Sequence, residues 1–208
     1  MSPLIRGLLA SALTLLVLAG CRSQPTRLFT IQAVTRGPGY PSYQGPVVRV
    51  DAVHVPPGLD RTELMWTIAP GELQIDDFAY WSAPLAQLAR RALSADLIAL
   101  FPPGTVLFPD LPKPADALGV EVDLLSMVVD RGQAQLTAGW MITAPGSDSS
   151  GERQTVTLQA PAGSGAAGVA DAYGVLMGEL AERIGADLAA RHSARPRARA
   201  VQLLGGTG

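Results

Sequence analysis

The sequence predicts one α+β domain, a largely antiparallel sheet with two main helices packed on one face, behind a short N-terminal targeting segment. Three observations support this prediction. The chain has 208 residues, 48% hydrophobic and 16% charged, a composition typical of a globular domain. Strand-like segments are followed by helical spacing of apolar residues, and this order occurs twice. Finally, an apolar run near the start ends at the only cysteine.

The first twenty residues are predicted to be a cleaved signal peptide. Residues 8–19, LLASALTLLVLA, are almost wholly apolar. A run of about 12 residues is too short to span a bilayer but suits the hydrophobic region of a secretory signal. Residues 18–21, LAGC, resemble the lipobox of bacterial lipoproteins. This resemblance implies cleavage between Gly20 and Cys21 and a covalent lipid on Cys21.

Two other interpretations of this segment stay open, an uncleaved anchor and an ordinary signal peptide with a chance cysteine. The short apolar run opposes the first, and the position of the only cysteine opposes the second. Two or three acyl chains would anchor the protein stably, whereas one chain binds weakly. The residue after the cysteine is Arg22, and in this respect the chain resembles lipoproteins that are sorted to the outer membrane. The resemblance implies a lipid-anchored protein at the periplasmic face of the outer membrane.

Residues 21–46 are predicted to hold the lipidated N-terminus, a tether and a first short strand, while the domain spans 27–190. The strand is predicted from Leu28, Phe29 and Ile31. The Gly/Pro/Tyr-rich run RGPGYPSYQGP then predicts a loop. Because tyrosine is enriched in protein interfaces, Tyr40 and Tyr43 in that loop are predicted to contact a partner.

The next elements are a strand, a hairpin and a helix. Residues 47–55 are β-branched, and the Pro70-Gly71 turn joins two short strands over 63–69 and 72–76. Helical spacing then begins at Ser82, which is predicted to cap the helix with Pro84 in its first turn. The members of the apolar stripe are Leu85, Leu88, Ala89, Ala92, Leu93, Leu97 and Leu100. Asp96 falls on that stripe, and we expect it to reach solvent or an arginine.

The second half repeats the order of strands and helix after a proline-rich loop over 101–114. Predicted strands cover 117–129, 133–143 and 153–159. A stripe from Val169 to Leu188 predicts the closing helix. The arginine-rich tail, 191–208, is predicted to be disordered, either solvated or touching anionic headgroups.

Composition and motifs argue against several function classes. The net charge of -2 provides no field for a nucleic acid backbone, so no nucleic acid partner is expected. Two histidines and one cysteine are too few for a zinc site, and no G-x-S-x-G elbow accompanies His54. We therefore predict no catalytic, cofactor-binding or metal-binding residues. Glu121 and Asp123 lie two apart on a strand, typical of a solvated face.

The run GSGAAG, residues 163–168, matches the dinucleotide fingerprint G-x-G-x-x-G between a strand and a helix. No strand follows that helix, and the acid expected further on, Asp187, falls inside the helical pattern. We interpret the run as a small-residue connection.

Three further stretches carry a family resemblance: VVRVDAVHVPPGLDRTEL, FAYWSAPLAQLARRALSADL and VDLLSMVVDRGQAQLTAGWMI. Together with the lipobox, their order over about residues 27–190 resembles the ABC-type transport auxiliary lipoprotein family, the PqiC-like lipoproteins. The motif positions, interpreted as structural, are Leu59, Asp60, Arg61, Trp81, Pro84, Leu85 and Trp140. Asp60 and Arg61 are expected to tie a turn between strands.

The resemblance implies a non-catalytic envelope component that accompanies an MCE-domain protein and an ABC-type permease. Such an assembly moves lipids between the inner and outer membranes and supports outer-membrane integrity. Direct contact with phospholipid and homo-oligomerisation stay open. An alternative is a structural or assembly adaptor of the envelope with no role in lipid transport, while an enzyme would need a pocket of converging polar groups.

Overall fold

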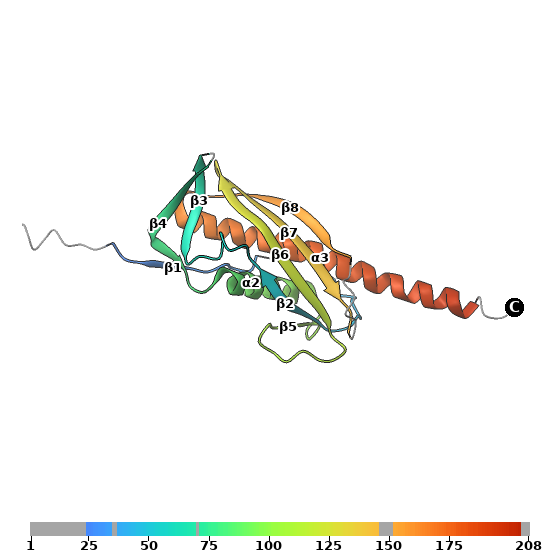
Figure 1. Ribbon diagram of the computed structural model, residues 1–208. Helices are drawn as coiled ribbons and strands as arrows, with labels where there is room; N and C mark the ends of the chain where they lie inside the picture. The colour runs from blue at the N-terminus through green and yellow to red at the C-terminus, as the bar shows by residue number, and fades with distance from the viewer. Residues whose placement is uncertain (1–23, 35–36, 70, 146–151, 205–208) are drawn as a thin grey trace, which may run out of the picture.

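The computed structural model describes residues 24–34, 37–69, 71–145 and 152–204 (Figure 1). Strands, a helix, more strands and a second helix follow one another in the predicted order. The elements are β1 Arg27–Phe29, β2 Val48–His54, β3 Glu63–Ala69, β4 Glu72–Trp81, α2 Leu85–Leu100, β5 Val106–Leu107, β6 Leu118–Asp130, β7 Gln133–Thr143, β8 Gln154–Pro161 and α3 Gly165–Leu204.

The strands form two sheets, with the orders β1-β4-β3 and β5-β2-β6-β7-β8. The α+β class is confirmed, but the predicted single sheet is divided, and its pairing is mixed. The hairpins β3–β4, β6–β7 and β7–β8 are antiparallel, while β1–β4, β2–β5 and β2–β6 are parallel. The parallel partners are far apart in the sequence because parallel pairing requires a long connection. Such pairing leaves no local sequence pattern, so the sequence did not predict it.

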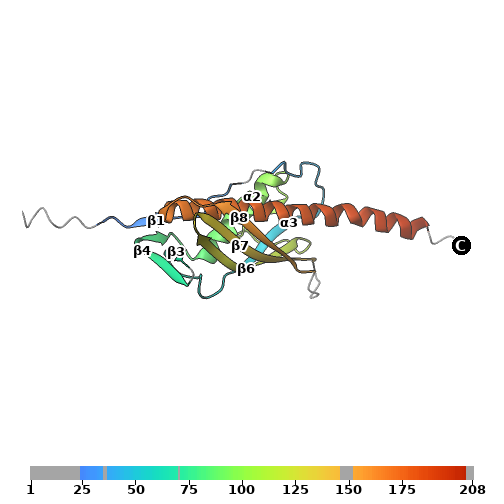
Figure 2. The ribbon, with the colours of Figure 1, turned by 90° about the horizontal axis from the view of Figure 1, so that it is seen from above.

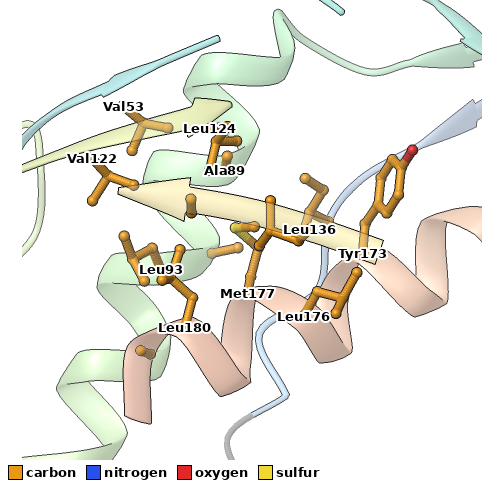
Figure 3. Packing of buried hydrophobic residues seen from close by; sticks show 14 of the residues in the cluster. Val53, Ala89, Leu93, Val122, Leu124, Leu136, Tyr173, Leu176, Met177 and Leu180 are labelled. Atoms are coloured by element: carbon orange, nitrogen blue, oxygen red, sulfur yellow. The ribbon is translucent and has the colours of Figure 1, made fainter. Parts of the chain in front are cut away.

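Both helices cover one face of the five-stranded sheet, as predicted, and they pack against each other (Figures 1 and 2). Figure 3 shows Leu93 of α2 and Leu180 of α3 meeting over strand residues such as Leu124 and Leu136. All of these leucines are buried. The helical and alternating periods of the sequence thus converge in one apolar core.

The start of α2 differs from the prediction. The helix begins at Leu85 with Pro84 as its N-cap residue, and no side chain caps it. The Ser82 backbone N–H instead donates to the Phe29 carbonyl at 2.8 Å, which ties β1 to the end of β4. Asp96 is fully buried on α2, so of the two expected environments, solvent or an arginine, solvent is wrong. Its position on the apolar stripe decides this burial, since the whole stripe faces the core.

The closing helix is longer than predicted. α3 continues to Leu204, through most of the segment predicted to be disordered. Alanine and arginine, which are strong helix formers, recur in this segment. β1 and the C-terminal part of α3 lie at opposite ends of the molecule (Figures 1 and 2). Among the described residues, no helix has the length and apolar character needed to cross a membrane.

Candidate functional site

The predicted cleavage and lipidation residues, Gly20 and Cys21, lie outside the described residues. The first strand, β1, begins at Arg27, so only residues 22–26 separate it from Cys21. β1 pairs with β4 through Leu28 and Tyr80. The three-stranded sheet is therefore the part of the fold to which the N-terminal segment is attached.

The first family motif forms a turn held by its backbone. The Leu59 and Asp60 N–H groups donate to the Pro56 carbonyl at 2.8 and 3.1 Å. Leu59 packs against the core, while Asp60 is exposed. The Arg61 side chain lies 3.9 Å from Glu63, at the start of β3, rather than pairing with Asp60. The expected Asp60–Arg61 tie is thus replaced by main-chain hydrogen bonds, which depend little on side-chain identity.

The second motif connects the three-stranded sheet to the helices. Trp81 ends β4, is buried, and stacks on Tyr173 of α3 with ring centroids 6.0 Å apart. Pro84 and the buried Leu85 then begin α2. Burial raises the pKa of the Tyr173 hydroxyl to about 12. These residues contribute to the packing between the sheet and α3.

The third motif residue, Trp140 on β7, is also part of the interior. Its indole N–H donates to an Asp187 carboxylate oxygen at 3.1 Å. Arg191, one turn further along α3, donates to the other oxygen of the same carboxylate at 2.7 Å. Asp187, the acid considered with the dinucleotide fingerprint, instead orients a buried indole. The satisfied indole N–H explains how this tryptophan is accommodated in the core.

The glycine-rich run performs a packing function at the start of α3. Gly165 has φ +68°, in the left-handed region that favours glycine. A Cβ atom on Gly168 would collide with the backbone of Gly163. Beside this turn lies a hollow of about 440 Å³, lined by residues that include Trp66, Arg131 and Val169. The glycine pattern follows from the close approach of loop and helix backbones.

Tyr40 and Tyr43 both pack against Phe101 at the end of α2. Tyr40 stacks on Phe101 with centroids 5.1 Å apart, and Tyr43 meets the same ring edge-on at 4.9 Å. Tyr43 is buried, and Gly185 leaves room for the Tyr40 ring. Burial and the nearby Glu182 carboxylate raise the pKa of the Tyr40 hydroxyl. The expectation of a contact aromatic is corrected for Tyr43, which is buried beside the end of α2, while for the half-buried Tyr40 it stays a prediction.

The outer face of the five-stranded sheet, on the side away from the helices, is polar along β2 and along the half of β6 that pairs with β2. Asp51 pairs with both Arg49, at 2.7 Å, and Lys113. A Cβ atom on Gly119 would collide with Asp51 and Lys113, so the glycine makes room for this cluster. Further along β6, Asp123 pairs with Arg153. We call this surface the polar outer face. Its charged side chains point away from the core.

A second outer surface is apolar. It comprises the outward side chains of β1, β3 and β4 and of the half of β6 that extends past the end of β2, and we call it the apolar outer face. Its members are Leu28, Met65, Leu73, Ile75, Leu125 and Val128. Met65 is half-buried and the other five are exposed. Exposed apolar side chains gathered on one side of a sheet can mark a site of contact with a partner or a membrane.

Sequence reasoning missed the apolar outer face. The signal was present, because ELMWTIA and VDLLSMVV carry apolar residues on both faces of a strand. Such runs are equally typical of strands buried on both faces, and only the placement of the strands distinguishes the two cases.

The titratable groups do not converge on a centre in the part of the chain that is described. Across those residues, no three His, Cys, Asp or Glu side chains gather in a group that could hold a metal ion. His54 is exposed at the end of β2. Glu121 and Asp123 share the polar outer face, as the strand period predicted. The arrangement supports surface contacts more directly than acid–base chemistry.

Comparison with known proteins gives the fold and the family. The chain is similar to the crystal structure of an uncharacterized protein, with 14% identity, a TM-score of 0.64, and coverage of 79% of this chain and 99% of that one. It is also similar to protein XCC0632 from Xanthomonas campestris, a DUF330 protein, with 15% identity, a TM-score of 0.61, and coverage of 82% and 99%. No curated protein matches the sequence.

Residues 28–185 match the family described as the ABC-type transport auxiliary lipoprotein component. The match begins in β1 and ends in α3, so it covers the described domain. It includes all three predicted motifs. The family is that of an auxiliary transport component, which is not an enzyme class. The chain therefore belongs to the ABC-type transport auxiliary lipoprotein family.

Proposed function

We propose that the protein is a periplasmic lipoprotein, anchored in the outer membrane through lipid on Cys21, that serves an ABC/MCE-type lipid transport system. It would act without catalysis, beside an MCE-domain protein and an ABC-type permease, and support outer-membrane integrity. The observation that carries the proposal is the family match over residues 28–185, preceded in the same chain by LAGC at 18–21.

The arrangement of the domain supports a docking role. The motif residues that are buried, Trp81, Leu85 and Trp140, act in the fold. The surfaces, by contrast, carry two unlike faces that separate partners could use. The segment between Cys21 and Arg27 is short, which would hold the domain close to the membrane while partners approach from the periplasm.

A pull-down from native cells in mild detergent tests the transport role. The lipidated, tagged protein is purified, and co-purifying proteins and lipids are identified by mass spectrometry. An MCE-domain protein and a permease in the eluate are expected. The control is the same preparation from cells that lack the permease, in which the MCE protein should still be recovered if the lipoprotein binds it directly.

A structural adaptor is the second candidate function. It is favoured by the exposed position of the apolar outer face, which is a surface rather than a cavity able to enclose lipid. An eluate that contains only outer-membrane or peptidoglycan-associated proteins would support the adaptor and contradict the transport role.

The anchor is tested separately with Cys21→Ser. The variant is expected to remain an unprocessed precursor without acyl label, because no thiol remains to accept the diacylglyceryl group. Palmitate labelling of cells and the mass of the mature N-terminal peptide measure this. Label that persists in the variant would contradict lipidation at Cys21.

A further inference from the structure

Exposed apolar side chains are concentrated on one part of the described surface. Seven large hydrophobic residues are exposed among the described residues, and five of them belong to the apolar outer face. The highest exposed fractions there are 69% for Leu28 and 60% for Leu73. The other two, Phe108 and Leu111, lie on the loop after β5. The concentration on one face indicates a common contact.

The register places these side chains on the same side. Met65 of β3 lies opposite Ile75 of β4, and opposed residues of an antiparallel pair point to the same face. Leu64, their neighbour on β3, is fully buried and points the other way. β3 in turn lies beside the upper part of β6 (Figure 1). The outward residues of three neighbouring strands thus form one surface.

A one-residue bulge continues this surface onto β6. The register with β7 shifts between Leu124 and Ser126, so Leu125 is the extra residue. Leu124 and Met127 on either side remain buried, while Leu125 and Val128 are exposed. The bulge therefore keeps two apolar side chains outside without breaking the core.

The proposed lipid anchor places this surface near a membrane. Residues 22–26 separate Cys21 from β1, and an extended chain rises at most about 3.6 Å per residue, so the span is about 20 Å. β1 lies in the same sheet as β4, and Leu28 points to the same side as Tyr80. Leu28 therefore lies at the end of the three-stranded sheet nearest the anchor, while Leu73 and Ile75 lie on the same side of that sheet, nearer the β3–β4 turn. The C-terminal part of α3 projects from the opposite end of the molecule (Figure 2).

We propose that the apolar outer face docks against the lipid surface of the membrane that holds Cys21. The proposal rests on the proposed lipid anchor. The anchor supplies proximity, and the apolar side chains of β1, β3, β4 and β6 supply a contact that orients the domain. The orientation would point α3 away from the membrane, toward the periplasm.

The charges around the face indicate which lipids it suits. β3 and β4 contain no basic residue. They carry four acidic residues, Glu63, Glu72, Asp76 and Asp77. Arg27 pairs with Asp76 at 2.7 Å, and Arg61 approaches Glu63. The two arginines offset two of the four acids, and Glu72 and Asp77 leave the surroundings net acidic. Docking would therefore be apolar in origin and stronger on zwitterionic than on anionic headgroups.

The test uses an environment-sensitive fluorophore on an introduced cysteine of the full, lipidated chain. The only native cysteine would be blocked by its lipid, so Ile75→Cys can be labelled alone. Phe108→Cys is the matched control, because Phe108 is also exposed but lies outside the apolar outer face. Each protein is reconstituted in phosphatidylcholine vesicles with or without a lipid that carries a quencher in its acyl chain.

Docking predicts a blue-shifted emission at position 75 that the lipid quencher reduces, and an emission at position 108 that it leaves unchanged. Quenching at 75 should weaken on phosphatidylglycerol-rich vesicles. Equal quenching at both positions, or stronger quenching on the anionic vesicles, would overturn the proposal. A blue shift that depends on protein density but not on the quencher would assign the face to a second copy of the chain, which also overturns it.

Vesicle flotation and the mass of the N-terminal peptide separate this inference from the anchor. A lipidated protein that floats with the vesicles but is not quenched at 75 contradicts docking alone. A mature chain without lipid on Cys21 contradicts the anchor, and the docking inference fails with it.

Discussion

The two outer faces of the molecule differ in chemistry although both belong to sheets that bury their other side. On the polar outer face, Asp51 pairs with Arg49 and Lys113, and Asp123 pairs with Arg153. On the apolar outer face, Leu73 and Ile75 are exposed. A sheet face that only meets water can be polar at no cost, since its polar groups remain hydrated or paired. An apolar face exposed to water indicates a contact that the isolated chain lacks.

The comparison also locates the connection between the two sheets. Leu64 and Trp81 bury the inner side of the three-stranded sheet, and Trp81 stacks on α3. The strands that carry the apolar outer face are thus held in place by the side chains packed on their inner side. Changes to this support should disturb it far more than changes to the face itself.

The largest effect is expected for Trp81→Ala, which removes the stacking partner of Tyr173. Truncating a buried aromatic side chain typically costs about 3–5 kcal/mol of unfolding free energy. Urea unfolding followed by circular dichroism measures it. Trp66→Ala, on the same sheet but half-buried, is the control and should cost less. Equal losses would mean that Trp81 does not specifically support the three-stranded sheet.

Alkaline pH should weaken the same connection. Tyr173 has its pKa raised from 10.0 to about 12, so the folded state keeps a proton that the unfolded state loses above pH 10. Its stabilising contribution is present below pH 10 and is lost as the pH rises through 12. Linkage gives roughly 3 kcal/mol over that window.

The unfolding free energy measured between pH 9 and 12 tests this titration. Tyr173→Phe should flatten the pH dependence while keeping the ring stacked on Trp81. An unchanged slope in the variant would show that other groups cause the alkaline loss, with the Tyr40 hydroxyl, whose pKa is also raised, as the next candidate.

A smaller effect is expected on the polar outer face for Gly119→Ala. The new methyl group would displace Asp51 and Lys113, which hold the loop after β5 against the sheet. Because both side chains can move aside, we expect a loss of about 1 kcal/mol. Hydrogen exchange of residues 108–114 should increase. Gly58→Ala, where a Cβ atom meets nothing within 4 Å, is the control and should change neither quantity.

The smallest effect on stability is expected for Leu73→Ser combined with Ile75→Ser. Exposed side chains away from special features change the unfolding free energy by within about 0.5 kcal/mol each. Thermal and urea unfolding of the double variant measure it. A loss as large as that of Trp81→Ala would mean that the apolar outer face is part of the folding core, and not a contact surface.

The local elements were predictable because their periods are local. The helix over Leu85–Leu100, the turn at Asp130–Gly132 and the strands on either side follow from spacing and turn residues alone. Asp96 and Tyr43 show the limit of that reasoning. Whether a polar residue on an apolar stripe, or an aromatic residue in a loop, is buried depends on which distant element packs over it. For Tyr43 that partner is Phe101.

In the candidate site, too, some features were predictable from the sequence and others depended on the packing of distant segments. Lipidation at Cys21 is predicted from sequence alone, because its signal is a short linear stretch, and it stays a prediction since Cys21 lies outside the described residues. The family motifs were also visible, but their roles were not. Trp140 could be explained only after α3 had placed Asp187 beside its indole N–H. The apolar outer face could not be distinguished from a doubly buried strand without the placement of β3 next to β6.

The sequence by itself determined the α+β class, the order of the elements and the family, and it predicts a lipidation signal at Cys21. These properties depend on residue type and on spacing within a few turns or strands. Tertiary structure alone decided the division into two sheets, the parallel pairing of β2 with β6, the burial of Asp96 and the face on which Leu73 and Ile75 are exposed. The reason is that pairing and burial between distant segments depend on packing of the whole chain, which no local period encodes.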